Sequence, residues 1–440
     1  MLKVAKFGGS SLAGAEQFKK VKAIVEADPA RRIVVVSAAG KRTDDDHKIT
    51  DLLYLTHAHL KYGVSYEEIF SMIERRYYGI RDALGLKYDL ESEFAKLRGE
   101  LRRDISVDYL VSRGEYLTAR LMAEYLGYGF VDAKDCVFFQ YDGTIDFSAT
   151  YRALAEAAVR SPRLVLPGFY GAMPNGRVRV MTRGGSDISG SLAANAADAD
   201  VYENWTDVSG ILMADPRIVD HPQPISRVTY DELRELAYMG ASVLHDESIQ
   251  PVKEKNIPLN IRNTNEPENP GTMIVERVER EEEAGGNRFI TGIAGRKGFT
   301  VLTIHKKQIA QNTAFVRRAL EIFENSHVPV EHITLGVDSF TIMTPTAQVG
   351  DSIYDIIGEI RKRCAPDDIR TEENIAMIAC VGRKMVYQPG TCGKLFGALG
   401  ENDINIKAIS QGTNEISILV GVHNHDFEKA IRVLYNGFVA

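Results

Sequence analysis

Lys3-Val4-Ala5-Lys6-Phe7-Gly8-Gly9-Ser10-Ser11 is the stretch of sequence that decides the fold. Val4 to Phe7 predicts a short buried strand, and the two glycines that follow allow the backbone to turn sharply. The serines are then expected to cap a helix whose buried face runs from Phe18 to Val25. This turn would place two backbone amides and a helix N-terminus beside the ammonium group of Lys6. Such a site suits an anion, above all a phosphate, although an ordinary turn with a solvated lysine fits the stretch equally well.

A second strand is expected at Ile33-Val34-Val35-Val36-Ser37-Ala38-Ala39-Gly40, a β-branched run that ends in small residues. Continuous apolar runs are typical of strands that are buried on both faces of a parallel sheet. Strand, helix and strand in this order predict an α/β fold, an open and mostly parallel sheet with helices on both faces. Ligands bind such sheets at the carboxyl ends of the strands. The polar loop over 41–50 follows, and its acidic part, 43–47, has no role that the sequence reveals.

The segment from 50 to about 127 is expected to be largely helical, because leucine, isoleucine and tyrosine recur at intervals of three and four. Within it, Ser112-Arg113-Gly114-Glu115 is predicted to open a helix from Tyr116 to Leu126. Glu115 is then either a functional carboxylate or a plain first-turn acid that the helix dipole favours.

A second glycine pair lies in Thr182-Arg183-Gly184-Gly185-Ser186-Asp187-Ile188-Ser189-Gly190-Ser191. Again a serine is predicted to cap a helix, the small-residue run from Leu192 to Ala199, with Asp187 in the first turn and Arg183 just before the glycines. Two Gly-Gly-Ser helix entrances, each with a charged residue nearby, favour a binding site over two ordinary turns.

Further polar groups follow the expected strand from Val201 to Trp205. Thr206-Asp207-Val208-Ser209-Gly210 ends that strand, and the next loop carries Asp215 and Arg217. Polar groups at a strand end, followed by an acid and a base, suit a nucleotide pocket, although an aspartate in this place also fits a plain turn.

Beyond an expected linker at 277–288, the sequence contains an internal repeat. Ala319 to Ile342 aligns with Leu395 to Ile418, and each copy reads as strand, helix, strand, hairpin turn and strand, the second followed by a helix. We therefore expect two βαββαβ modules of the ferredoxin-like kind after a larger domain. The predicted boundaries are 1–280 for the α/β domain, 288–365 for the first module and 370–440 for the second, with strands that are either sequential or nested.

Composition argues against several classes of function. The net charge of −7 and the lack of a lysine- or arginine-rich block disfavour nucleic acid as a partner. The four cysteines are scattered, which fits a reduced protein better than a disulfide framework or a zinc site. No apolar run reaches the ~20 residues that span a bilayer, and no targeting segment is recognised, so a cytoplasmic protein without a membrane partner is expected.

The residue types around the two glycine pairs are those that phosphoryl transfer requires. This reaction needs positive charge and amide donors on the γ-phosphate, and a carboxylate that organises the cations or Mg²⁺. Lys6, Asp187 and the glycine amides supply these groups, and no general base is needed if the acceptor is already an anion. The motifs GxxxxGK[ST], GxSxG and HExxH are absent from the sequence.

Three motifs together resemble those of the amino acid kinase family: Lys6-Phe7-Gly8-Gly9-Ser10-Ser11, Thr182-Arg183-Gly184-Gly185-Ser186-Asp187 and Thr206-Asp207-Val208-Ser209-Gly210. Within that family the chain is similar to the aspartate kinases, which also match Ala237-Tyr238-Met239-Gly240-Ala241 and carry a C-terminal pair of ACT regulatory modules. The resemblance covers essentially the whole chain.

The resemblance implies that ATP, with Mg²⁺, phosphorylates the β-carboxylate of L-aspartate to give 4-phospho-L-aspartate and ADP, the first step of lysine, threonine and methionine biosynthesis. The implied catalytic residues are Lys6 and Asp187. The implied aspartate-binding residues are Ser37, Thr50, Glu115 and Arg183. The implied nucleotide-binding residues are Lys6, Phe7, Gly8, Gly9, Gly184, Gly185, Ser186, Thr206, Asp207, Asp215, Arg217 and Arg262. No residue is expected to be a metal ligand. The sequence departs from the family pattern at Leu212, where relatives often have tyrosine, and at Arg262, where many have lysine.

In the family, ACT pairs bind an end-product amino acid, commonly lysine or threonine, and lower the activity. The resemblance therefore implies an effector site at Asp338, Ser339 and Glu415, with lysine as the preferred effector, although Glu415 is equally well explained as an exposed turn acid. It also implies a homodimer or homotetramer that assembles through the ACT modules.

Two other interpretations stay open. One is a kinase of the same fold that acts on glutamate, acetylglutamate or uridylate, but such enzymes are not expected to carry the paired repeat. The other is an amino-acid sensor without catalytic activity. The joint presence of Lys6, Arg183 and Asp187 argues against the sensor, because an inactive scaffold has no need of that set.

Overall fold

The computed structural model describes all residues except Arg183, Ser242, Val243, His245, 279–288, Val386, Tyr387, 413–415 and Ala440, together with the side chain of Asp246. The chain divides into two compact units. The first unit comprises Met1–Ile211, Pro224–Leu233 and Val243–Gly285, and the second comprises Leu212–Gln223, Arg234–Ser242 and Gly286–Ala440.

An eight-stranded sheet forms the middle of the first unit, with the strand order β10-β12-β11-β7-β1-β2-β4-β3. Its strands are β1 (Lys3–Phe7), β2 (Arg31–Val36), β3 (Gly129–Phe130), β4 (Leu164–Pro167), β7 (Val201–Thr206), β10 (Arg227–Thr229), β11 (Leu259–Asn263) and β12 (Thr272–Val275). The central strand β1 is parallel to both β2 and β7, and only the pairing of β11 with β12 is antiparallel among these strands. The predicted α/β class with an open, mostly parallel sheet is confirmed.

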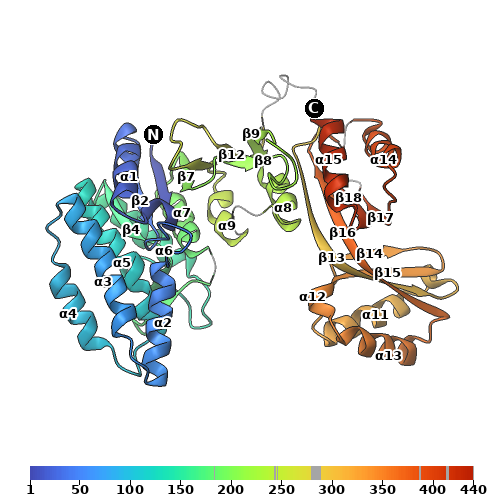
Figure 1. Ribbon diagram of the computed structural model, residues 1–440, viewed down its shortest axis with the longest axis horizontal. Coiled ribbons are helices and arrows are strands. Elements are labelled where there is room, and N and C mark those ends of the chain that lie inside the picture. Colours follow the sequence, from blue (N-terminus) through green and yellow to red (C-terminus); the bar gives the residue numbers. More distant parts are fainter. Residues whose placement is uncertain are drawn as a thin grey trace. The chain divides into compact units, whose positions relative to one another are not determined.

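Helices cover both faces of this sheet (Figure 1). The helices are α1 (Ala15–Ala27), α2 (Ile49–Tyr62), α3 (Glu67–Leu84), α4 (Leu90–Glu100), α5 (Val107–Leu126), α6 (Phe147–Arg160), α7 (Gly185–Ala196) and α9 (Asp246–Glu254), with the 3₁₀ turns η1 (Gly9–Leu12) and η2 (Ala133–Asp135). Helix α8 (Tyr230–Tyr238) is divided between the two units. One hydrophobic core joins α1 to α5 with β1 and β2, while α7 packs on β1, β2, α6 and α9. The short strands are β5 (Tyr170–Ala172), β6 (Val178–Val180), β8 (Ile211–Leu212) and β9 (Pro224–Ile225).

Two predictions about helix starts are wrong. Neither glycine turn uses a serine cap. The turn η1 starts after Gly8 and helix α7 starts after Gly184, both without a side-chain cap. Ser11 Oγ instead lies 2.8 Å from Thr264 Oγ1. Helix α5 begins at Val107, where the side chain of Ser106 caps it, so Glu115 lies in the middle of this helix rather than in its first turn. Helix α5 continues through Gly114, because tertiary packing overrides the low helix propensity of glycine.

The second unit is built on an antiparallel sheet with the order β14-β15-β13-β16-β18-β17. Its elements are β13 (Gly292–His305), η3 (Ile309–Gln311), α11 (Thr313–Asn325), β14 (His332–Leu335), β15 (Ser339–Pro345), α12 (Thr346–Val349), α13 (Ser352–Cys364), β16 (Asp368–Val381), α14 (Thr391–Glu401), β17 (Ala408–Ser410), β18 (Ser417–His423) and α15 (Phe427–Phe438). The order helix, strand, strand occurs in both copies of the repeat. Both copies also add a second helix, α13 and α15, where the sequence predicted one only after the second copy.

The long strands β13 and β16 are shared between the two copies of the repeat. Phe299–His305 of β13 pairs with β15, whereas Gly292–Lys297 pairs with Ala376–Val381 of β16, the same part of β16 that pairs with β18. The start of β13 therefore belongs to the same half of the sheet as β17 and β18, so that the copy containing α11 and α13 is enclosed within the other.

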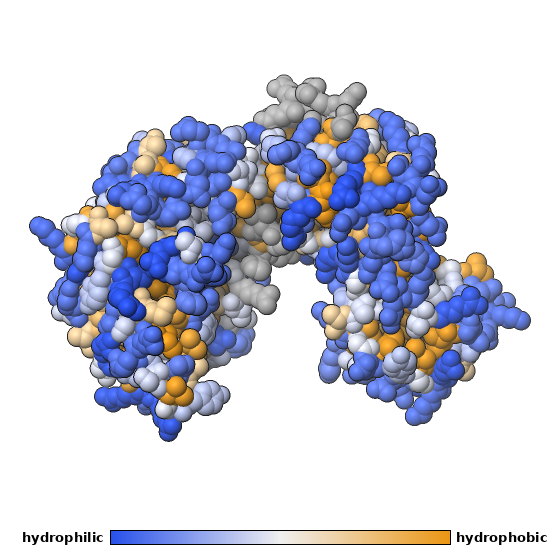
Figure 2. Space-filling view, viewed as in Figure 1, coloured by the Kyte–Doolittle hydropathy of each residue, from blue (hydrophilic) through white to orange (hydrophobic). Residues whose placement is uncertain are grey.

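The surface visible in Figure 2 is largely hydrophilic, with hydrophobic residues scattered over it. Within the described part of the chain, no helix combines the length and the apolar character needed to cross a membrane.

Candidate active site

The first glycine turn lies at the carboxyl end of β1 and leads directly into η1. The amide of Gly8 donates to the carbonyl of Trp205 at 2.9 Å, and the amide of Ser11 donates to the carbonyl of Gly8 at 3.0 Å. Among the described residues, the amides of Gly9 and Ser10 have no hydrogen-bond acceptor. The Gly8 amide is therefore engaged within the fold, whereas Gly9 and Ser10 carry the unpaired donors at the start of η1, where an anion can be bound.

Gly9 is in close contact with Gly40, the residue that ends the small-residue run after β2. The amide of Gly40 donates to the carbonyl of Gly9 at 2.8 Å, and a Cβ atom on Gly40 would lie 2.5 Å from the carbonyl carbon of Gly9. The obstructing atoms belong to the backbone, so they cannot swing aside as a side chain would. Gly40 thus fixes the position of the turn that carries the free amides.

Gly40→Ala is expected to lower kcat by about 10²-fold, because the added methyl group pushes the glycine turn out of place. The free amides on this turn would then no longer be aligned with the reacting atoms. Gly79→Ala is the matched control: Gly79 is an exposed glycine inside α3, and a Cβ there meets nothing within 4 Å. This control is expected to keep full activity and to unfold at the same or a slightly higher temperature. Steady-state kinetics of both variants checks the prediction, and full activity of Gly40→Ala would contradict it.

Lys6 forms a buried polar cluster with the start of α7. Its Nζ pairs with Oδ1 of Asp187 and lies 3.4 Å from Oδ1 of Asn204, whose Nδ2 donates to Asp187 Oδ1 at 2.9 Å. Lys6 is 7% exposed and Asn204 is 3% exposed, and Nζ would lie 3.7 Å from a Cβ on Gly8. The ammonium group is therefore held beside the first glycine turn, and its carboxylate partner comes from the second. This juxtaposition of the two glycine turns is what the sequence predicted.

Glu115 is a buried carboxylate that points at the ends of β2 and α2. The side chain is 3% exposed, the backbone of Ala38 hydrogen-bonds it, and its Oε2 has no partner among the described residues. Burial raises the pKa of Glu115 to about 8. A buried carboxylate with a free oxygen is suited to bind a cationic group of a ligand, and the alternative of a plain first-turn acid is wrong.

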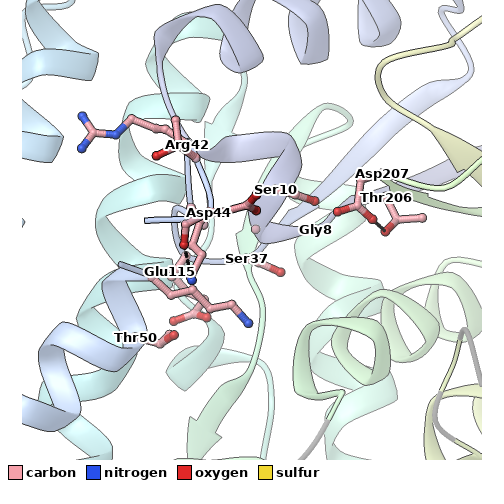
Figure 3. Close-up of a pocket in the computed structure, with 15 residues that line it drawn as sticks. Gly8, Ser10, Ser37, Arg42, Asp44, Thr50, Glu115, Thr206 and Asp207 are labelled. Atoms are coloured by element: carbon pink, nitrogen blue, oxygen red, sulfur yellow. Dashed lines mark hydrogen bonds between the residues drawn. The ribbon is translucent and has the colours of Figure 1, made fainter. Parts of the chain in front are cut away.

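A cavity of about 570 Å³ lies at the carboxyl ends of β1, β2 and β7. It is lined by Gly8, Gly9, Ser10, Ser37, Ala38, Gly40, Lys41, Arg42, Thr43, Asp44, Lys48, Thr50, Glu115, Thr206 and Asp207. Figure 3 shows Thr50, Ser37 and Glu115 toward one end and Thr206 and Asp207 toward the other, with Gly8 and Ser10 between them. The free amides thus lie between a carboxylate pocket and a second polar pocket, as a phosphoryl group passing between two substrates requires.

Two residues expected to bind the nucleotide, Phe7 and Arg262, do not line this cavity. Phe7 is fully buried and stacks on Trp205 with ring centroids 6.0 Å apart, so its side chain belongs to the core. Arg262 lies over the Trp205 ring at 4.6 Å and lines a different cavity, with Lys3 and Arg31. The structure does not bring these two side chains into the cavity around Gly8 and Gly9.

The remaining predicted residues are placed as follows. Gly184 has the left-handed φ of 63° that favours glycine and precedes α7, in which Gly185 and Ser186 form the first turn before Asp187. Asp215 and Arg217 belong to the second unit and pair with each other at 2.6 Å. Arg183 lies outside the described residues.

In the second unit, Asp338 lies in the hairpin turn between β14 and β15, and its Oδ1 accepts a hydrogen bond from the amide of Gln308 at 2.7 Å. Ser339 begins β15 and pairs in register with His305. Glu415 lies outside the described residues.

Sequence reasoning missed two parts of this site. Asn204 completes the cluster around Lys6, and the signal was available, because an asparagine in a buried strand requires a polar partner. Lys41 and Lys48, in the loop after β2, also line the cavity. Their spacing matches no simple motif, so only the fold reveals them.

A family model described as the amino acid kinase family matches residues 1–263, and a model described as an ACT domain matches residues 378–438. The first match spans more than half of the chain and contains all the residues that line the cavity. The chain therefore belongs to the amino acid kinase family, as its motifs predicted.

Comparison with individual proteins narrows this assignment. Aspartokinase 3 of Bacillus subtilis (strain 168) is 35% identical, and the match covers 100% of this chain and 99% of that protein. The crystal structure of Clostridium acetobutylicum aspartate kinase is similar with a TM-score of 0.90 and 44% identity over 99% of both chains. E. coli aspartokinase III, at 25% identity over the whole of both chains, has TM-scores of 0.75 for its complex with aspartate and ADP and 0.76 for its complex with lysine and aspartate. These full-length similarities group the chain with the aspartokinases.

Proposed function

We propose that the protein transfers the γ-phosphoryl group of ATP to the β-carboxylate of L-aspartate, giving 4-phospho-L-aspartate and ADP. The observation that carries the proposal is the cluster of Lys6, Asp187 and Asn204 beside a glycine turn, in reach of a cavity that also contains the buried Glu115. The crystal structure of E. coli aspartokinase III contains aspartate and ADP, the acceptor and the product nucleotide of this reaction, and so supports the proposal.

The acceptor carboxylate is already an anion, so the reaction needs positioning and charge stabilisation rather than a general base. Lys6 supplies positive charge to the phosphoryl group during transfer, and the amides of Gly9 and Ser10 donate hydrogen bonds to its oxygens. Asp187 and Asn204 hold the Lys6 ammonium group in place. Preorganised donors of this kind do not have to reorient when charge develops.

Glu115 binds the α-ammonium group of aspartate, and Ser37 and Thr50 contribute hydroxyl groups at the same end of the cavity. Arg183, which precedes the second glycine turn, is proposed as the partner of the α-carboxylate because its planar guanidinium pairs with carboxylates through two hydrogen bonds. Thr206 and Asp207 face the nucleotide. Asp215 and Arg217 remain proposed nucleotide contacts.

Mg²⁺ is proposed to enter with ATP, bound mainly by phosphate oxygens. The donor set fits a cation of this kind, because Mg²⁺ in such sites uses one or two carboxylates together with substrate phosphates. Asp187 and Asp207 are the carboxylates available near the turn. In the described part of the chain, no three histidine, cysteine or acidic residues are grouped so that they could hold a metal ion.

We also propose that the second unit regulates the first in response to an amino acid, with lysine preferred and threonine as the alternative. The ACT domain match and the E. coli complex with lysine and aspartate support this assignment. Asp338, Ser339 and Glu415 are the proposed contacts, in modules bounded near 288–365 and 370–440 that follow a catalytic domain of 1–280. We propose that these modules also join the chains of a homodimer or homotetramer, and that the enzyme starts lysine, threonine and methionine biosynthesis in the cytoplasm.

Coupled measurement of ADP release tests the substrate and the effector together. With ATP and Mg²⁺, aspartate is expected to support turnover, whereas glutamate and UMP are expected to support less than about a hundredth of that rate, since the buried Glu115 and the glycine turn hold the two ends of the acceptor at a fixed separation. Added lysine is expected to lower the rate. Equal rates with glutamate or UMP would contradict the proposed substrate, and a rate unchanged by lysine and by threonine would contradict the proposed regulation.

A further inference from the structure

We propose that Asp46 and Arg76 are positioning residues, which dock the loop 41–48 onto the cavity so that Lys48 supplies a positive charge at the acceptor end. The inference rests on the proposed function, because it assigns the second charge that an anionic acceptor needs there. It also gives a role to the acidic part of the loop, 43–47.

Arg76 reaches from α3 to three segments that surround the cavity. Its Nη1 donates to the carbonyls of Ala13 and Gly40 at 3.2 and 2.8 Å, and its Nη2 donates to Asp46 Oδ2 at 2.5 Å. Ala13 directly follows η1, and Gly40 is the residue whose amide donates to Gly9. One buried guanidinium therefore connects α3 to the first glycine turn, to the end of β2 and to the loop.

Docking of the loop depends on Asp46, because its carboxylate neutralises the buried guanidinium of Arg76. Asp46 is the only carboxylate that pairs with Arg76 among the described residues, and the two side chains are 10% and 5% exposed. Asp46 also accepts hydrogen bonds from the amide and the side chain of Arg42, which keeps the loop closed on itself. If the loop left its place, the buried cation of Arg76 would have no counter-ion, and an unpaired buried charge is strongly unfavourable.

The docked loop contributes cations to the cavity. Lys41 donates to the carbonyl of Asp44 at 2.9 Å, whereas Lys48 has no ion-pair partner among the described residues and lines the cavity two positions before Thr50. In Figure 3, Asp44 lies toward Glu115 and Ser37 and away from Thr206 and Asp207. The loop therefore covers the end where the acceptor binds. Arg42 is paired with Asp46 and Lys41 is bonded to the Asp44 carbonyl, so among the described cations that line the cavity Lys48 is the one without a side-chain hydrogen bond or ion pair.

The pair of Arg98 and Glu74 provides a comparison that has no connection with the cavity. Arg98 Nε donates to Glu74 Oε1 at 2.7 Å, and Glu74 lies on α3 only two positions from Arg76. Both pairs join α3 to a neighbouring segment through one carboxylate. Loss of the Glu74 pair is expected to affect stability alone, so Glu74→Gln is the matched control.

A double-mutant cycle of Asp46→Asn and Lys48→Gln tests the proposal. Each single variant is expected to raise the KM for aspartate about tenfold with kcat within about threefold, as loss of one charge contact does. The double variant is expected to stay near tenfold rather than reach a hundredfold, because Lys48 is already misplaced when Asp46 is changed. Glu74→Gln is expected to keep the KM of the wild type. Independent, multiplying effects, or an unchanged KM in Asp46→Asn, would overturn the proposal.

Limited digestion with trypsin separates failure of this inference from failure of the proposed function, because it needs no turnover. Cleavage after Lys41 and Arg42 is expected to be about tenfold faster in Asp46→Asn than in the wild type and in Glu74→Gln, since a loop without its buried pair opens more often. Equal cleavage rates in all three proteins would overturn the docking role, even if aspartate proves to be the substrate.

Discussion

Lys6→Met is expected to reduce phosphoryl transfer by about 10³-fold or more while leaving the KM for aspartate within about threefold. The reason is that Lys6 acts on charge that develops as the phosphoryl group moves, so its removal affects kcat rather than substrate binding. The side chain is buried and its ammonium group is held by Asp187 and Asn204 beside the glycine turn. Steady-state kinetics with ATP and aspartate measures both constants.

Lys3→Met is the control for this experiment. Lys3 lies on the same strand and pairs with Asp28 at 2.8 Å and with Glu203 at 3.2 Å, but it lines the separate cavity near Trp205. The control is expected to keep kcat within about twofold, because loss of partly exposed ion pairs affects mainly stability. A kcat for Lys6→Met that equals that of the control would contradict the assigned role.

Glu115→Gln is expected to raise the KM for aspartate by about 10² to 10³-fold. Glutamine keeps the shape of the side chain, but it leaves the α-ammonium group of the substrate without its buried counter-charge, which costs about 3–5 kcal/mol. Glu124→Gln, on the same helix, is the control, because among the described residues the Glu124 carboxylate accepts hydrogen bonds from the exposed amides of Lys87 and Tyr88 alone. An aspartate KM in Glu115→Gln within threefold of that of the control would contradict the assignment.

Titration of Glu115 is expected to make both the KM for aspartate and the stability of the protein depend on pH, and Glu115→Gln is expected to remove this dependence. Burial raises the pKa of Glu115 to about 8, so the empty site is mostly protonated at pH 7 and must lose a proton when the ammonium group binds. The KM for aspartate is therefore expected to fall by up to about tenfold per pH unit as the pH rises toward 8 and to level off above it. Since Glu115 holds its proton more tightly in the folded free enzyme than in the unfolded chain, its contribution to the free energy of unfolding falls between pH 4.5 and 8, by up to about 1.4 kcal/mol per pH unit. Both slopes are expected to vanish in Glu115→Gln.

The central part of the fold was predictable because it depends on local signals. The run Ile33–Val36 is buried on both faces of the sheet, as its β-branched residues indicate, and Val4–Phe7 forms the strand beside it. Parallel strands that end in small and polar residues meet at one edge of a sheet. The order of motifs along the chain was therefore sufficient to predict that Lys6 and Asp187 would meet.

The parts that failed depend on tertiary contacts. The sequence does not reveal that the Gly8 amide donates to the carbonyl of Trp205, a residue on a strand far along the chain. Glu115 was predicted at a helix start, yet it lies inside α5, where Gly114 permits close packing: a Cβ on Gly114 would lie 2.8 Å from Ala38 Cβ. No residue near Arg76 in the sequence indicates that it pairs with Asp46. Such pairings follow from the packing of α3 on the turn and cannot be read from spacing.

Trapping of the product with hydroxylamine tests most directly whether one cavity brings the phosphoryl group and aspartate together. Hydroxylamine converts an acyl phosphate into a hydroxamate, so wild-type protein with ATP, Mg²⁺ and aspartate is predicted to form aspartyl hydroxamate and ADP in equal amounts. Lys6→Met is predicted to form both at least about 10³-fold more slowly. ADP release without hydroxamate, or hydroxamate formed by Lys6→Met at the wild-type rate, would contradict the account.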